Sequence, residues 1–121
     1  MELTKEGIVT TETVGSVKVI NFLSGRIREE REVFKTLEEL GQYIEANLGS
    51  KLLINMKSIE YLSSAGLGLL VGLLKKSRKT SGQFKICCLQ ESIFELFEVM
   101  RLTKIFEIFD NQQEALKTFN Q

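Results

Sequence analysis

The later part of the chain alternates short apolar runs with helical patterns, and this alternation restricts the fold more than any other feature. The predicted strands are residues 52–56, 83–89 and 104–109, and the predicted helices are residues 64–81, 92–100 and a last helix capped by Asp110. A β-α-β-α-β-α order predicts parallel strands, joined by right-handed crossovers, with helices on the faces of the sheet.

Two further strands and one long helix precede this region. Residues 8–12 and 16–23 have β-type patterns and are separated by a short turn, which predicts a hairpin. Residues 29–48 carry one apolar stripe that ends at Leu48, an acidic start that suits a helix dipole, and a following Gly49 suited to positive φ. We therefore expect a single α/β domain over residues 1–121. Its mixed, largely parallel central sheet has four to five strands, an N-terminal β-hairpin and about four packed helices.

Composition argues against several classes of function. Sixteen Lys and Arg residues balance sixteen Asp and Glu residues, so no basic surplus favours nucleic acid. The longest uncharged apolar run, residues 65–74, is too short to span a bilayer, and the N-terminus lacks a signal-peptide pattern. We therefore expect a cytoplasmic protein without membrane insertion. The adjacent Cys87 and Cys88 match neither a disulfide framework nor a zinc site, and on a strand they would point to opposite faces.

No catalytic constellation is present in the sequence. The chain contains no histidine, which removes the usual general base and the commonest metal ligand. Gly66, Gly68 and Gly72 fall inside a helical pattern rather than in a strand-to-helix phosphate loop. We therefore expect a protein that is not an enzyme and that holds neither a metal nor a cofactor.

The stretch 59–74, I-E-Y-L-S-S-A-G-L-G-L-L-V-G-L-L, is the most informative about function. Ser63 and Ser64 stand at a helix start, where unpaired N–H groups and the helix dipole favour a capping hydroxyl and equally a phosphate. Either Ser63 only caps the helix, or one of the two hydroxyls accepts a phosphoryl group. Phosphorylation would add about −1.5 to −2 charges, which the helix end tolerates but a partner docked on the neutral corner does not. A small-residue stripe, expected to let another backbone approach closely, comprises Ala65, Gly68 and Gly72.

The sequence resembles STAS domains, the family of bacterial anti-sigma factor antagonists. The resemblance covers nearly the whole chain and rests on F-L-S-G-R-I at 22–27, L-L-I-N-M at 52–56, Y-L-S-S-A-G-L-G at 61–68 and L-T-K-I-F-E-I-F-D at 102–110. The usual family corner has an acidic residue, then the phosphoacceptor Ser or Thr, then a small residue and G-L-G. This pattern implies that Ser64 is the acceptor, with Ser63 as the alternative.

The resemblance implies a partner-switching protein. The unphosphorylated form would bind an anti-sigma factor that is also a serine kinase and so free a sigma factor. Phosphorylation would end that binding, and a serine phosphatase would reset it. We expect a monomer or a weak dimer. The residues implied to bind the partner are Tyr61, Ser63, Ser64, Ala65, Gly66, Leu67, Arg26 and Arg28.

Three positions depart from the common family pattern. Ser63 stands where the family often has Asp, Asn55 replaces a frequent Asp at the end of the third strand, and Arg28 replaces another acidic residue. All three changes remove negative charge near the corner. They motivate an alternative, in which the domain is a non-phosphorylated scaffold or accessory subunit of a stress-sensing or lipid-transport complex and the serines act only as helix caps.

Overall fold

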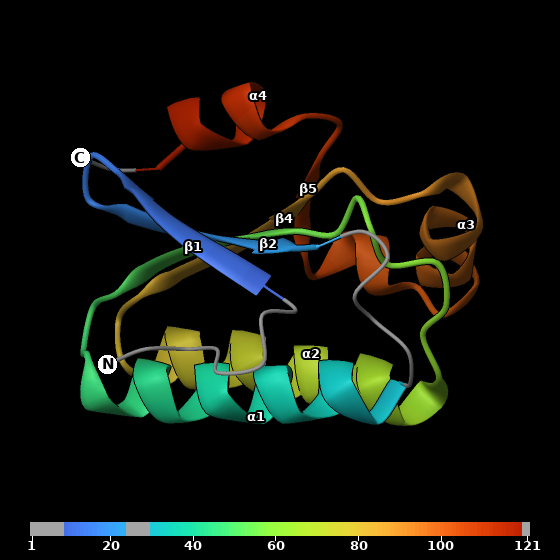
Figure 1. The fold of residues 1–121 in the computed structure, drawn as a ribbon, viewed down its shortest axis with the longest axis horizontal. Helices are drawn as coiled ribbons and strands as arrows, with labels where there is room; N and C mark the ends of the chain where they lie inside the picture. Colours follow the sequence, from blue (N-terminus) through green and yellow to red (C-terminus); the bar gives the residue numbers. More distant parts are fainter. Residues whose placement is uncertain (1–8, 24–29, 120–121) are drawn as a thin grey trace.

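A computed structural model of the protein describes residues 9–23 and 30–119 (Figure 1). Within these residues five strands form one sheet in the order β1-β2-β3-β4-β5. The strands are β1 (Val9–Val14), β2 (Val17–Phe22), β3 (Lys51–Asn55), β4 (Gln83–Cys87) and β5 (Glu107–Phe109). β1 and β2 form an antiparallel hairpin, and every other neighbouring pair is parallel. The predicted mixed sheet with an N-terminal hairpin is confirmed.

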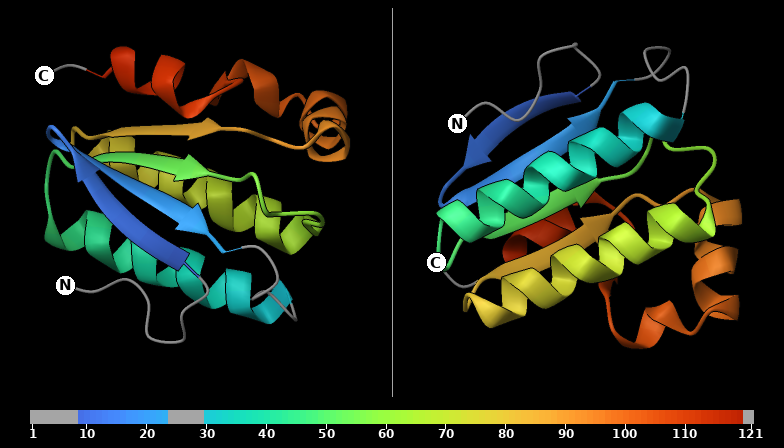
Figure 2. Two further views of the ribbon diagram at one scale, coloured as in Figure 1. Left: turned by 45° about the horizontal axis from the view of Figure 1, so that its top comes forward. Right: turned by 90° about the horizontal axis from the view of Figure 1, so that it is seen from below.

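Helices cover both faces of the sheet. They are α1 (Glu30–Ala46), α2 (Ser64–Lys79), α3 (Glu91–Val99) and α4 (Gln112–Lys117), with a 3₁₀ turn at Leu102–Lys104. The long helices α1 and α2 pack side by side under one face, whereas α4 covers the other face and α3 lies beyond the carboxyl end of β4 (Figures 1 and 2). Corners between a strand and the following helix therefore gather at one end of the molecule.

The central strand β3 explains why its sequence lacks alternation. Leu52 and Ile54 belong to the large apolar cluster between the sheet and the two long helices. Leu53 belongs to the smaller cluster beneath α4. Because both faces of β3 are buried, apolar residues are required at consecutive positions, as predicted.

The helix predicted over residues 29–48 is shorter than its apolar pattern. α1 ends at Ala46, and Leu48 is 77% exposed instead of belonging to the buried stripe. Gly49 has the expected positive φ of 75°, and its N–H donates a hydrogen bond of 2.8 Å to the carbonyl of Thr80. The helix therefore ends two residues before its apolar pattern does.

The C-terminal part of the chain differs from the sequence prediction in two places. Residues 104–109 do not form one strand, because the 3₁₀ turn extends to Lys104 and β5 begins only at Glu107. The last helix is capped by Asn111 rather than by Asp110, and the Asn111 side chain accepts a hydrogen bond of 2.8 Å from the N–H of Glu114. Both are favourable cap residues, and the helix starts one residue later than predicted.

The prediction that the two adjacent cysteines point to opposite faces was wrong. Cys88 has a φ of 65°, so the chain turns out of the strand immediately after Cys87. Both residues pack against the cluster beneath α4. Burial and the neighbouring Cys88 thiol raise the pKa of the Cys87 thiol far above its usual value. Cys87 is therefore held as a neutral thiol in the core.

Candidate functional site

Ser63 is the N-cap of α2. Its backbone is extended, with φ −81° and ψ 172°, and its side chain accepts a hydrogen bond of 3.2 Å from the N–H of Gly66. The carbonyl of Ser63 accepts the first helical hydrogen bond, from Leu67, at 2.9 Å. The Ser63 hydroxyl thus satisfies one of the four N–H groups that a helix start leaves unpaired.

Ser64 begins α2 and faces outward. Its side chain is exposed, and within the part of the chain that the structure describes its hydroxyl makes no hydrogen bond. Ala65 is also exposed, and Tyr61, in the loop before the helix, is 69% exposed. These three residues form the accessible part of the predicted site, which we call the α2 corner.

Gly66 and Leu67, which we expected to bind a partner, are buried instead. A Cβ atom at Gly66 would lie 2.6 Å from Leu62 Cδ1 and 3.3 Å from Phe34 Cε1. No side chain fits at Gly66 without moving Leu62, and the Leu67 side chain packs in the core. These two positions therefore hold the helix start against the core and present no side chain to a partner. Arg26 and Arg28 lie outside the residues that the structure describes.

A carboxylate that the sequence reasoning missed lies at the same corner. The N–H of Ser63 donates a hydrogen bond of 2.5 Å to Glu30 Oε2, from the first residue of α1. The sequence indicated only that an acidic start suits a helix N-terminus, and nothing in it pointed across 33 residues to Ser63. The corner therefore contains a carboxylate supplied by α1 rather than by the residue before Ser64.

The loop that leads to the corner is fixed by amide side chains. Asn55 Oδ1 accepts a hydrogen bond of 3.0 Å from the N–H of Lys57, while Asn55 Nδ2 donates one of 3.0 Å to Gln112 Oε1. Gln90 Nε2 donates a hydrogen bond of 2.8 Å to the carbonyl of Lys57. An amide can accept and donate at once, whereas an ionised Asp at position 55 could not donate to Gln112. Asn55 therefore joins β3 to α4.

The small-residue stripe on α2 faces outward, which corrects the expectation that another backbone packs against it. Cβ atoms built at Gly68 and Gly72 would meet no atom within 4 Å, and Ala65 is exposed. The helix packs on the core through the other side, where Leu67, Leu70 and Leu74 are buried. The stripe continues directly from the α2 corner and leaves the backbone of α2 accessible from outside.

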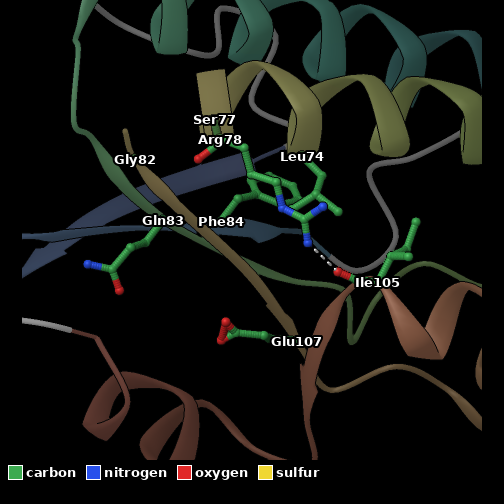
Figure 3. A pocket seen from close by; sticks show the side chains of 8 residues that line it. All are labelled: Leu74, Ser77, Arg78, Gly82, Gln83, Phe84, Ile105 and Glu107. Carbon is green, nitrogen blue, oxygen red and sulfur yellow. Dashed lines mark hydrogen bonds between the residues drawn. The ribbon is translucent and has the colours of Figure 1, made fainter. Parts of the chain in front are cut away.

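A small cavity lies far from the corner, near the end of α2. It measures about 110 Å³ and is lined by residues that include Leu74, Phe84 and Glu107 (Figure 3). Arg78 Nη2 donates a hydrogen bond of 3.0 Å to the carbonyl of Ile105 beside it. Ligand sites usually enclose roughly 300–1,000 Å³, so this cavity is too small for a typical organic ligand. Within residues 9–23 and 30–119, no group of three or more His, Cys, Asp or Glu side chains could hold a metal ion.

The fold agrees with the comparison to known families. Residues 12–115 match the STAS domain, and the chain belongs to this family. It is 36% identical over 63 residues to the anti-sigma-B factor antagonist of Bacillus subtilis (52% of this chain, 58% of the relative). It is 24% identical over 78 residues to the anti-sigma F factor antagonist of Paenibacillus polymyxa (64% of this chain, 67% of the relative). The chain thus spans about three fifths to two thirds of the length of these relatives.

Solved structures show the same fold. An anti-sigma-factor antagonist (STAS) domain protein from Planctomyces limnophilus superimposes with a TM-score of 0.77 at 23% identity, covering 89% of this chain and 94% of that one. The Bacillus cell fate determinant SpoIIAA in its phosphorylated form superimposes with a TM-score of 0.67 at 18% identity, covering 90% and 96%. None of the helices within residues 9–23 and 30–119 has the length and apolar character that a membrane span requires.

Proposed function

We propose that this protein is an anti-sigma factor antagonist that binds an anti-sigma factor through the α2 corner. Phosphorylation of Ser64 by that partner, acting as a serine kinase, ends the binding, and a serine phosphatase restores it. The exposed Ser64 hydroxyl at the first position of α2 is the observation that carries this proposal. Membership of the STAS family and the names of the curated relatives support it. We place this exchange in the bacterial cytoplasm.

The different environments of the two serines favour Ser64 over Ser63 as the acceptor. The Ser63 hydroxyl is half-buried and already accepts the Gly66 N–H, so a kinase could reach it only by disturbing a helix cap worth about 1 kcal/mol. The Ser64 hydroxyl is exposed and free of such contacts within the described residues. A kinase can approach it without opening the helix.

The charges around the corner explain how a phosphate acts as a switch without unfolding the domain. The start of α2 carries a partial positive charge, which tolerates an anion at Ser64. Three exposed residues next to it, Tyr61, Ala65 and Gly68, are uncharged, and the nearby Glu30 carboxylate is negative. A partner docked on this surface would have to desolvate a phosphate of about −1.5 to −2 charges. Binding is lost, while the fold is kept.

The test uses the full chain, its cognate anti-sigma factor and ATP, with mass spectrometry to locate the phosphate. Wild-type protein should be modified at Ser64 and then released from the partner. Ser64→Ala should keep binding and lose modification, while the matched control Ser63→Ala should still be modified. Treatment with the phosphatase should restore binding.

Two outcomes would count against the proposal. If neither serine is modified and the anti-sigma factor does not bind, the antagonist function is lost. If Ser64→Asp binds a partner as tightly as wild type does, and that partner belongs to a stress-sensing or lipid-transport assembly, the domain acts as a constitutive scaffold. The two serines would then act only as helix caps at the start of α2.

A further inference from the structure

Within residues 9–23 and 30–119, the outer edge of β1 has no paired strand. β1 ends the sheet, and no described strand lies along its outer side (Figure 2). Only Val9 is buried, and the five residues that follow it are exposed. The opposite edge strand, β5, has three residues and begins with Glu107, as expected of a protected edge.

The sequence of β1 lacks the usual devices that protect an edge strand. V-T-T-E-T-V contains five β-branched residues, one charge, and neither Lys nor Pro. Its six-residue register with β2 is uninterrupted, so no bulge twists the edge away. A strand of high β-propensity with an open edge is a template for another strand.

The hairpin geometry identifies the outward-facing backbone groups. Val14 and Val17 pair across a two-residue turn, and in such hairpins the flanking residues exchange hydrogen bonds. Because hydrogen-bonded and non-hydrogen-bonded pairs alternate, the N–H and C=O groups of Val9, Thr11 and Thr13 point away from β2. These three residues can pair with a further strand without disturbing the hairpin.

We infer that a second copy of this chain pairs with that edge, antiparallel, about a two-fold axis at Thr11. Thr11 then faces Thr11 of the second copy, Thr10 faces Glu12, and Val9 faces Thr13. About six main-chain hydrogen bonds form, and two five-stranded sheets become one continuous sheet. β1 forms one edge of the sheet, whereas α2 packs against α1 and β4, so the inference goes beyond the antagonist function and does not depend on it.

Polar complementarity between Thr10 and Glu12 favours a second copy of this chain as the occupant, in the register centred on Thr11. Glu12 lies on the face covered by α4, where its Oε1 accepts a hydrogen bond of 2.9 Å from Gln112 Nε2. Thr10, two residues away, shares that face, so its hydroxyl can donate to Glu12 of the second copy. The alternative two-fold register, centred on Glu12, places two carboxylates directly opposite each other and is disfavoured. Of these two registers, the one centred on Thr11 is therefore favoured.

The dimer is expected to be weak. Edge pairing of one short strand buries less than the roughly 1,200 Å² of stable complexes, so its Kd lies in the micromolar to millimolar range. Sedimentation equilibrium of the full chain between about 10 µM and 1 mM covers that range.

A matched pair of lysine substitutions tests the register. Thr11→Lys places lysine against lysine across the axis and should weaken the dimer by about fivefold or more. Thr10→Lys adds the same charge one residue away, opposite Glu12 of the second copy, and should tighten the dimer by up to about fivefold. High salt should cancel the gain from Thr10→Lys. Circular dichroism and thermal melting check that both variants fold.

Opposite shifts of the two variants support the inference. A monomer at every concentration overturns it, and so does a dimer that neither substitution affects, because that dimer would form elsewhere. Equal shifts in the same direction also overturn it, since they would reflect net charge rather than register.

Discussion

The N–H of Ser63 donates a hydrogen bond to the carboxylate of Glu30, which joins the residue that caps α2 to the first residue of α1. The two long helices therefore begin at one shared junction. Ser64, which follows immediately, is exposed at that junction. A phosphate placed there would meet both the positive end of α2 and the negative charge of Glu30. The stability of the junction and the proposed phosphorylation of Ser64 are therefore linked, and each can be tested separately.

Ser63→Ala should destabilise the fold. The substitution leaves the Gly66 N–H without its side-chain acceptor, so the free energy of unfolding should fall by about 1 kcal/mol. Ser64→Ala removes an exposed hydroxyl of the same kind and should change it by less than about 0.5 kcal/mol. Urea denaturation of both variants measures the difference. Equal losses would mean that the Ser63 cap contributes nothing.

Glu30→Gln should separate the charge at the junction from its hydrogen bond. The amide oxygen can still accept the Ser63 N–H, but without charge the bond weakens by roughly 1 kcal/mol. A double-mutant cycle with Ser64→Asp should show that the added carboxylate is less favourable by about 0.5 kcal/mol beside Glu30 than in the E30Q background. Additive effects in urea denaturation would show that the two positions do not interact.

Those parts of the fold that depend on local periodicity could be predicted from the sequence. The amphipathic α1 and the doubly buried β3 can each be recognised from the apolar pattern of that segment alone, and the hairpin can be recognised from two β-type runs separated by a short turn. The cap at Ser63 was also predictable, since an N-cap depends on residues three positions apart. The start of α2 and the order of the strands and helices could therefore be predicted from residues that are close in sequence.

Features set by a single backbone angle or by distant contacts could not be predicted. The left-handed φ of Cys88 turns the chain at a residue with no glycine signature. The contact between Glu30 and Ser63 links segments that only the packing of α1 on α2 brings together. A glycine stripe in a helix signals either a close neighbour or an open surface, and only the three-dimensional arrangement showed that Gly68 and Gly72 are open.

Cys87 should resist alkylation in the folded protein. Burial and the adjacent Cys88 thiol raise its pKa, and the reactive form of cysteine is the thiolate. In a Cys88→Ser variant, iodoacetamide at pH 8 should label Cys87 at least about a hundredfold more slowly in buffer than in denaturant. Mass spectrometry follows the reaction. Equal rates in the two conditions would contradict a buried, neutral thiol.

Lys85→Ala should destabilise the packing of α4. Lys85 is 4% exposed, and its Nζ donates hydrogen bonds of 2.9 and 2.8 Å to the carbonyl and Oγ1 of Thr118 and lies 3.2 Å from Glu107 Oε2. Losing these contacts and the buried stem should lower the free energy of unfolding by about 2–4 kcal/mol. Lys104→Ala, at an exposed position, should change it by less than about 0.5 kcal/mol. If urea denaturation gave similar losses in the free energy of unfolding for the two variants, Lys85 would not stabilise the packing of α4.

Substitutions at Gly68 and Gly72, on the outward stripe of α2, should show whether the stripe affects the stability of the fold or the binding of a partner. Gly68→Ala and Gly72→Ala each add a methyl group in open space within a helix, so each should raise the free energy of unfolding by about 0.5–1 kcal/mol. Gly82→Ala is the opposing control, because its Cβ would lie 2.6 Å from the carbonyl oxygen of Ser50 and should destabilise the fold.

If a partner docks on the stripe, the larger side chain of Gly68→Leu should weaken binding to the anti-sigma factor by about tenfold, or roughly 1.4 kcal/mol. Calorimetric titration measures this loss, and thermal melting confirms that the variant remains folded. Unchanged affinity would restrict the binding surface to Tyr61, Ser64 and Ala65, because a side chain of that size at Gly68 would obstruct any partner that covers the stripe.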